Sequence, residues 1–292
     1  MPAPPPVPGR RLALRPGLPV VRRDDRHLQV GVDAPHRTVL EDTPDVRRLL
    51  ADLQSSGRPA PTTAAGHQAL LRLTAAGHLV DADVLEAALG DAPDRAATAA
   101  AFALHGDAAP ERLADRARVR AEVTGPEGAV RLLTRLLGDC GAGPTEPSGE
   151  GAVAVVVADG EVGRDRLDPL VRAGLPHLLV SLGGTSVTIG PFVVPGLTAC
   201  VRCVDAHRGE RDPRRATVVD QAARSGDLRP RDPALAMLAL AWAVRDVTAW
   251  SDGEQPSTWS RTVTVGTDLQ PVAHAWTRHP HCGCAWDEAL VG

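Results

Sequence analysis

Lysine, asparagine and tyrosine are absent from this sequence, and isoleucine occurs once. Every full positive charge on a side chain is therefore an arginine, a bias that indicates a GC-rich coding sequence rather than a functional demand. The 36 acidic side chains slightly outnumber the 32 basic ones. This balance gives no general signal for binding nucleic acid or a membrane surface.

Long apolar runs are also missing. No run approaches the roughly 20 residues that a membrane-spanning helix needs, and the N-terminal MPAPPPVPGRR has no apolar core of a signal peptide. We therefore expect a cytoplasmic protein without a membrane partner. In the cytosol, cysteines are more often metal ligands than disulfides. At 292 residues the chain is long enough for two modest domains.

Four of the five cysteines form two close pairs, a CxxC and a CxC separated by 78 residues. The pairs are Cys200 with Cys203 and Cys282 with Cys284. Four thiolates suit a tetrahedral structural zinc with a metal–sulfur distance of about 2.3 Å. Gly283 permits the tight turn that the CxC pair would need. His279 or His281 could replace one thiolate, and two disulfides or four unconnected buried thiols are the alternatives. Cys140 stands alone, and we interpret it as structural or incidental.

The N-terminal part alternates between strand and helix patterns. Residues 1–17 contain six prolines and predict a disordered or extended tail. Residues 18–90 predict three short strands followed by three helices, which is a winged-helix-like module. Thr43 and Pro44 are typical of a helix start, and Thr62 or Thr63 of another.

A winged helix has two common uses, binding DNA and accepting an extended peptide along an exposed strand edge. The expected recognition helix, TAAGHQALLRLTAAG, carries a single arginine, Arg72. Phosphate contacts need several cations, so the composition favours peptide binding. A winged-helix DNA-binding regulator remains the alternative.

The remaining residues predict an α/β domain with a damaged nucleotide site. A strand over 118–123 and a helix over 128–137 flank the position where a dinucleotide fold keeps its phosphate loop. There Pro126 lacks an N–H and Glu127 would repel phosphate. The next expected strand is replaced by a turn-rich connector over 141–151. We therefore expect no ATP on this chain.

Further along, Ala152–Asp159 is a continuous apolar run, typical of a strand buried in a parallel sheet. A hairpin through Gly183-Gly184 follows. The charged stretch 208–231 predicts an exposed, mobile loop, either a docking surface for a partner or merely solvated. Pro233 begins a long apolar helix, and a final hairpin delivers the chain to the second cysteine pair.

Two segments resemble a known family: GPFVVPGLTACVRCVDAHRGERDP over 190–213 and HPHCGC over 279–284. They are similar to the ThiF-like, ubiquitin-activating-enzyme-like partner proteins of bacteriocin cyclodehydratases. These are the leader-peptide-binding proteins of thiazole/oxazole-modified microcin (TOMM) clusters. The resemblance covers roughly residues 18–292. It implies a winged-helix precursor-recognition element over 18–90 and a degenerate ThiF-like, Rossmann-type domain over 91–292.

The resemblance also implies a function without catalysis by this chain. The leader of a ribosomally made precursor peptide would add a strand to the third strand of the module, flanked by its third helix. A YcaO-type partner would then use ATP to cyclise Cys, Ser or Thr residues of the core into azolines. A ThiF-like adenylyltransferase that activates a peptide carboxylate is the alternative, and a homodimer is an open option.

The family's site residues carry over onto two groups. The leader-binding residues would be Arg37, Thr38, Val39, Leu40, His67, Gln68 and Leu71. The zinc ligands would be Cys200, Cys203, Cys282 and Cys284.

Overall fold

The structure is a computed structural model that describes residues 10–144, 152–225 and 228–284 of the 292-residue chain. No helix in this described part is long and apolar enough to cross a membrane.

The chain divides into two compact units, unit 1 over residues 1–113 and unit 2 over residues 114–292. The sequence placed the boundary at 90/91 instead. The difference arises because the third and fourth helices of unit 1 share one core, in which Leu85 and Phe102 are buried.

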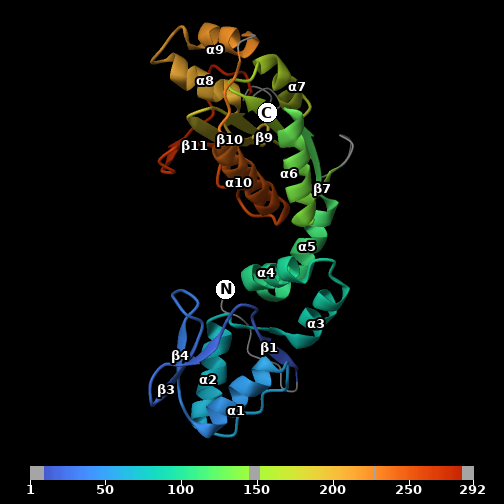
Figure 1. Ribbon diagram of the computed structural model, residues 1–292, viewed down its shortest axis with the longest axis vertical. Helices are drawn as coiled ribbons and strands as arrows, with labels where there is room; N and C mark the ends of the chain where they lie inside the picture. The colour runs from blue at the N-terminus through green and yellow to red at the C-terminus, as the bar shows by residue number, and fades with distance from the viewer. Residues whose placement is uncertain (1–9, 145–151, 226–227, 285–292) are drawn as a thin grey trace, which may run out of the picture. The chain divides into compact units, whose positions relative to one another are not determined.

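Unit 1 contains five strands and five helices among its described residues, counting the helix that leaves it (Figure 1). The strands are β1 (Leu12–Leu14), β2 (Val20–Arg22), β3 (His27–Val30), β4 (Thr38–Glu41) and β5 (Leu79–Asp81). The helices are α1 (Pro44–Gln54), α2 (Ala64–Ala75), α3 (Ala82–Asp91), α4 (Arg95–His105) and α5 (Ala109–Arg118).

Three strands, β2 to β4, are followed by two helices as expected, but strand β5 comes between α2 and the third helix, α3. β2, β3 and β4 form an antiparallel sheet in that order. Thr43 caps α1 and Thr63 caps α2, since each hydroxyl accepts a hydrogen bond from a backbone N–H of the first helical turn. Leucines of α1 and α2 pack with Val30 and Leu40 of the sheet to form the core.

The expectation of a tail over residues 1–17 is wrong for its second half. Leu12–Leu14 form β1, which pairs antiparallel with β5, and all three side chains are buried. A strand of three residues carries too little periodicity to be seen in sequence, and its partner lies more than 60 residues away. Residues 1–9 lie outside the described residues.

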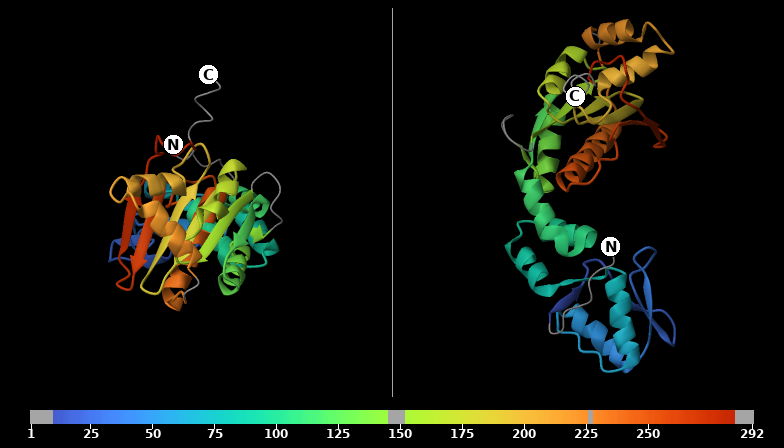
Figure 2. Two further views of the ribbon diagram at one scale, coloured as in Figure 1. Left: turned by 90° about the horizontal axis from the view of Figure 1, so that it is seen from above. Right: turned by 180° about the vertical axis from the view of Figure 1, so that it is seen from behind.

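Unit 2 is built on one mixed sheet of seven strands, in the order β12-β11-β10-β9-β8-β6-β7. The left view of Figure 2 shows this order as a change from red strands at one edge to green strands at the other. The strands are β6 (Arg120–Thr124), β7 (Gly143–Pro144), β8 (Ala152–Asp159), β9 (His177–Leu182), β10 (Ser186–Val193), β11 (Arg261–Gly266) and β12 (Pro271–Ala275). β6 to β9 pair in parallel, and β10 to β12 are antiparallel.

Helices cover both faces of this sheet. They are α6 (Glu127–Asp139), α7 (Asp168–Arg172), α8 (Val201–Gly209), α9 (Arg215–Arg224) and α10 (Pro233–Ser251). α6 and α10 pack together on one face in the largest core of the chain. On the other face Leu167, just before α7, and Val201 of α8 pack with Val156 and Leu179 of the sheet. The continuous apolar sequence of β8 follows from this burial on both faces, as predicted.

Three local expectations need correction. The charged stretch 208–231 contains a helix, α9, rather than only a loop. The connector over 141–151 contains a short strand, β7, that pairs in parallel with β6. The register of β9 with β10 places the tight turn at Gly184-Thr185, one residue later than expected.

Candidate metal centre and peptide-binding edge

The two cysteine pairs converge in unit 2. Cys200 is the N-cap residue of α8 and Cys203 lies in its first turn. Cys282 and Cys284 follow β12, and Gly283 between them has a φ of 75°, which glycine adopts without strain. The Sγ atoms of Cys200 and Cys282 lie 3.4 Å apart, and those of Cys203 and Cys284 3.3 Å apart. All four sulfurs lie within 4.8 Å of one another.

These distances separate the alternatives. A disulfide would bring two sulfurs to about 2.05 Å, and all five cysteines are free. Four sulfurs at about 2.3 Å from one tetrahedral ion would lie about 3.8 Å apart. The observed 3.7 Å between the sulfurs of Cys200 and Cys203 agrees with that value. The cluster therefore fits one metal ion, and neither disulfides nor isolated thiols describe it.

The protonation of the cluster also fits a cation. Hydrogen bonds from neighbouring thiols lower the pKa of Cys203, and its hydrogen bond to Cys203 raises the pKa of Cys200. Burial raises the pKa of Cys284 to about 12. A divalent cation would displace the thiol protons because metal ligation requires thiolates.

Both ring nitrogens of the neighbouring His279 have partners other than the sulfurs. His279 is buried, and its Nε2 lies 3.1 Å from Oε1 of Glu210. Its Nδ1 accepts a hydrogen bond from the backbone N–H of His281. Among the described residues, neither histidine belongs to the four-sulfur group. The pair of His279 with Glu210 instead fastens the segment before Cys282 to the end of α8.

The predicted leader-binding residues lie on two neighbouring elements of unit 1. Arg37 precedes β4, and Thr38, Val39 and Leu40 belong to it. Leu40 is 1% exposed and part of the core, whereas Val39 on the other face is half-buried. In the described part of the chain, β4 pairs with β3 on one side and with no strand on the other.

The second group lies on α2, which contacts β4 (Figure 1). α2 is the second helix of the unit, not the third, so the expected helix number is wrong, although α2 does contact β4. His67 and Gln68 are exposed, and Leu71 is 59% exposed. An exposed leucine on a helix that contacts an edge strand is a feature of surfaces that accept a peptide strand.

The crevice where a Rossmann-type fold binds nucleotide lies between β6 and β8, where the strand order reverses. Pro126 is the N-cap of α6, and a side chain at Gly125 would collide with the backbone of Val157. The guanidinium of Arg229 enters this crevice and donates to the carbonyl oxygen of Asp159 at 2.8 Å. Three carboxylates line the same space: Asp159, Glu161 and Asp165.

No family model and no curated protein matches the chain. Solved structures do match. A heterocyclase in complex with substrate and cofactor superposes with a TM-score of 0.67 at 21% identity, over 96% of this chain and 40% of that one. The heterocyclase TruD gives a TM-score of 0.70 at 20% identity, over 94% of this chain and 43% of TruD. The chain thus spans about two fifths of these heterocyclases.

A second kind of structure matches over nearly its whole length. E. coli MccB with AMPCPP and MccA has a TM-score of 0.65 at 11% identity, over 93% of this chain and 98% of MccB. At these identities the similarity establishes the fold alone: an α/β chain with a mixed sheet and helices, as in MccB and TruD.

Proposed function

We propose that this chain binds the leader of a ribosomally made precursor peptide and presents its core to a YcaO-type cyclodehydratase. That partner would use ATP to form the azolines and azoles of a peptide natural product. The observation that carries the proposal is the edge of β4 that pairs with no described strand, together with the contact between β4 and α2, a helix that also has exposed side chains. The winged-helix designation of residues 18–90 belongs to the same proposal.

The strand edge would contribute affinity for a peptide without selecting its sequence. An added strand gains main-chain hydrogen bonds, and side chains of the flanking helix select among peptides. Once the leader is held, the tethered core meets the partner's active site at a raised effective concentration.

The fold similarity supports this division of labour. The heterocyclases extend well beyond the stretch that this chain matches. We propose that ring formation takes place in the part of the heterocyclases that this chain does not match. We also propose that no residue described here is catalytic. A ThiF-like adenylyltransferase stays the second candidate because MccB shares the fold and has been crystallised with ATP.

The cysteine cluster is proposed to hold a structural zinc ion. Soft thiolate ligands favour zinc among common divalent ions, and a closed four-thiolate site leaves no coordination position for a substrate. Its role would be to hold the segment after β12 against the start of α8.

The test of leader binding uses two exposed leucines on helices of unit 1, Leu71 of α2 and Leu104 of α4, the latter 51% exposed. A fluorescent leader peptide encoded beside this chain's gene is titrated with the full-length protein. We expect micromolar or tighter binding that Leu71→Asp weakens at least about tenfold, since it places a charge where an apolar contact is lost. Leu104→Asp should leave binding unchanged. Absence of binding, or equal losses in both variants, would contradict the proposal.

A further inference from the structure

The hydrogen bonds around β3 fix the direction in which each backbone group of β4 points. In an antiparallel pair, residues that bond to the partner strand alternate with residues whose N–H and C=O point away from it. On the side of β2, the N–H of Arg23 donates to the carbonyl oxygen of His27, and the N–H of Gly31 to that of Pro19, both at 2.9 Å. Both bonds follow the register of β2 with β3. The odd-numbered residues of this stretch of β3 therefore bond to β2.

The other side of β3 carries the complementary set. The N–H of Asp42 donates to the carbonyl oxygen of Arg26 at 2.7 Å, and this bond continues the register of β3 with β4. Even-numbered residues of β3 therefore bond to β4, and even-numbered residues of β4 bond back to β3. In β4 these are Thr38 and Leu40.

Val39 and Glu41 consequently direct their N–H and C=O groups to the open edge of β4. In the described part of the chain no strand pairs with this edge, and neither backbone group of Val39 has a hydrogen-bond partner. Glu41 differs, because its carbonyl oxygen already accepts from the N–H of Thr43 at 3.1 Å. Within β4, Val39 is thus the residue that offers both a donor and an acceptor.

A strand added at this edge must follow the same alternation. Every second residue of it directs its N–H and C=O to β4, and the residues between direct theirs away. A residue without an N–H, such as proline, cannot donate to the carbonyl oxygen of Val39. The edge therefore selects a backbone pattern in its ligand, independently of the side chains.

We propose that Val39 is the central backbone contact of the leader peptide. Its N–H donates to a leader carbonyl oxygen, its C=O accepts from a leader N–H, and the N–H of Glu41 makes a third bond. The ligand is an extended segment in which the residue that donates to Val39 is not proline, whereas its two neighbours need no N–H. This inference rests on the proposed function and deepens it by giving the register of the bound strand.

The first test follows single amides by NMR-detected hydrogen exchange in the full-length protein, with and without the leader encoded beside its gene. Without leader, we expect the amides of Thr38 and Leu40 to exchange slowly and those of Val39 and Glu41 to exchange fast. Saturating leader should slow exchange at Val39 and Glu41 at least about tenfold. Slow exchange of Val39 in the free protein, or bound leader that leaves Val39 fast, would overturn the proposed register.

The second test changes the ligand and leaves the protein as it is. Synthetic leaders that each carry one backbone N-methyl group are titrated into wild-type protein. Methylation should weaken binding at least about tenfold at the residue that donates to Val39, and less than about twofold at its two immediate neighbours. Equal losses at neighbouring positions, or no loss at any position, would contradict the proposal.

Two proline variants locate the contact on the protein. Val39→Pro and Arg22→Pro each remove an N–H that faces an open sheet edge, the first in β4 and the second in β2, and neither removes a bond between the strands. With both folds checked by circular dichroism, Val39→Pro should weaken leader binding at least about tenfold, and Arg22→Pro should leave it unchanged. Equal binding by the two variants would overturn the proposal. Wild-type protein that binds no leader would instead refute the proposed function, and this inference with it.

Discussion

Asp45 shows how one carboxylate joins two helices of unit 1. It lies in the first turn of α1, is 5% exposed, and accepts hydrogen bonds from the backbone N–H groups of Thr62 and Thr63 at 3.0 and 2.9 Å. A side chain at Gly66 would collide with its Oδ2. Glycine inside α2 is therefore explained by the approach of this carboxylate, although glycine is otherwise unfavourable there.

The environment of Asp45 predicts that acid lowers the stability of unit 1. Hydrogen bonds from Thr63 and then Thr62 hold the pKa of Asp45 well below its usual range. The folded-state pKa therefore lies below the unfolded value of about 3.9. The stabilisation is complete at neutral pH and is lost as the pH falls through about 4 towards the folded pKa.

We therefore expect Asp45→Asn to lower the melting temperature at pH 7 and to flatten its fall between about pH 5 and pH 2. Circular dichroism follows the unfolding. All five tryptophans lie in unit 2, so tryptophan fluorescence reports separately on that unit and should be unaffected. Asp25→Asn is the matched control, because the Asp25 side chain is 99% exposed. An Asp45→Asn protein with the wild-type pH profile would contradict this account.

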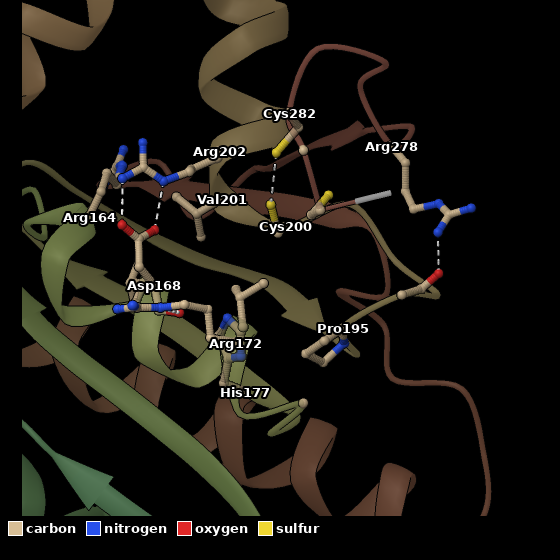
Figure 3. A pocket seen from close by; sticks show the side chains of 16 residues that line it. Arg164, Asp168, Arg172, His177, Pro195, Cys200, Val201, Arg202, Arg278 and Cys282 are labelled. Carbon is tan, nitrogen blue, oxygen red and sulfur yellow. Dashed lines mark hydrogen bonds and ion pairs between the residues drawn. The ribbon is translucent and has the colours of Figure 1, made fainter. Parts of the chain in front are cut away.

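At the residue scale, the sequence predicted that the four cysteines come together. It gave no sign of the cavity of about 670 Å³ beside them (Figure 3). CxxC and CxC are short patterns whose chemistry is fixed by residue type, so their meeting in space could be anticipated. Arg172 and His177 give no such signal, because an arginine at a helix end and a histidine at a strand start are ordinary. Both line the cavity beside the cysteines, and among the described residues Nε2 of His177 is buried without a hydrogen-bond partner.

Among the elements, the segment that carries Cys282 and Cys284 depends most on the proposed metal. Within this segment, the backbone N–H of Cys282 donates a hydrogen bond to the carbonyl oxygen of His279 at 3.0 Å. It is also held by the His279–Glu210 contact, by hydrogen bonds from Arg278 to the carbonyl oxygen of Gly196 and between Thr277 and His207, and by the sulfurs. A cross-link at this point would hold the end of the described chain against α8.

Removing one ligand should release both the metal and the segment. Elemental analysis of wild-type protein should find one zinc per chain, and Cys203→Ser should lose it and unfold at lower temperature by tryptophan fluorescence. Cys140→Ser is the control, since Cys140 lies at the end of α6 outside the cluster. A Cys203→Ser protein that retains full zinc would refute the four-thiolate assignment, as would wild-type protein without bound metal.

Element boundaries were predicted best where periodicity and caps agree. α1, α2 and α10 each begin after a Thr or Asp that accepts from the first turn. α9 was missed because its apolar stripe is reduced to one buried residue, Val219, among charged neighbours. β1 was missed because a strand of three residues is specified by its distant partner rather than by its own sequence.

For the molecule as a whole, the shared fold leaves open whether the sheet domain retains nucleotide chemistry. The crevice at the ends of β6 and β8 is lined by three carboxylates and three arginines, and the guanidinium of one of these, Arg229, donates to the backbone carbonyl oxygens of Asp159 and Ala223. Phosphate binding at such a site needs free backbone N–H groups at a helix N-terminus, and Pro126 removes one.

We therefore expect no ATP-dependent chemistry from this chain alone. Calorimetric titration with ATP and magnesium should give no binding heat, with or without precursor peptide. Pyrophosphate exchange should stay at background. E. coli MccB, which has been crystallised with ATP, is the positive control. Saturable ATP binding or peptide-dependent exchange would instead favour the adenylyltransferase.

The molecule offers more than one strand edge to a peptide. β4 and β2 are the edges of the three-stranded sheet in unit 1, beside the two-stranded sheet of β1 and β5. β12 is an edge in unit 2, with all five residues exposed. β4 is distinguished because it contacts α2, whose exposed face carries His67, Gln68 and Leu71.

Hydrogen–deuterium exchange of the full-length protein, with and without its precursor leader, tests this choice directly. Strand addition at β4 predicts slower exchange over Thr38–Glu41 and along α2, with β2 and β12 unchanged. Protection at β12 or β2 instead, or none anywhere at saturating leader, would contradict the proposal that this chain holds its substrate on the β4 edge.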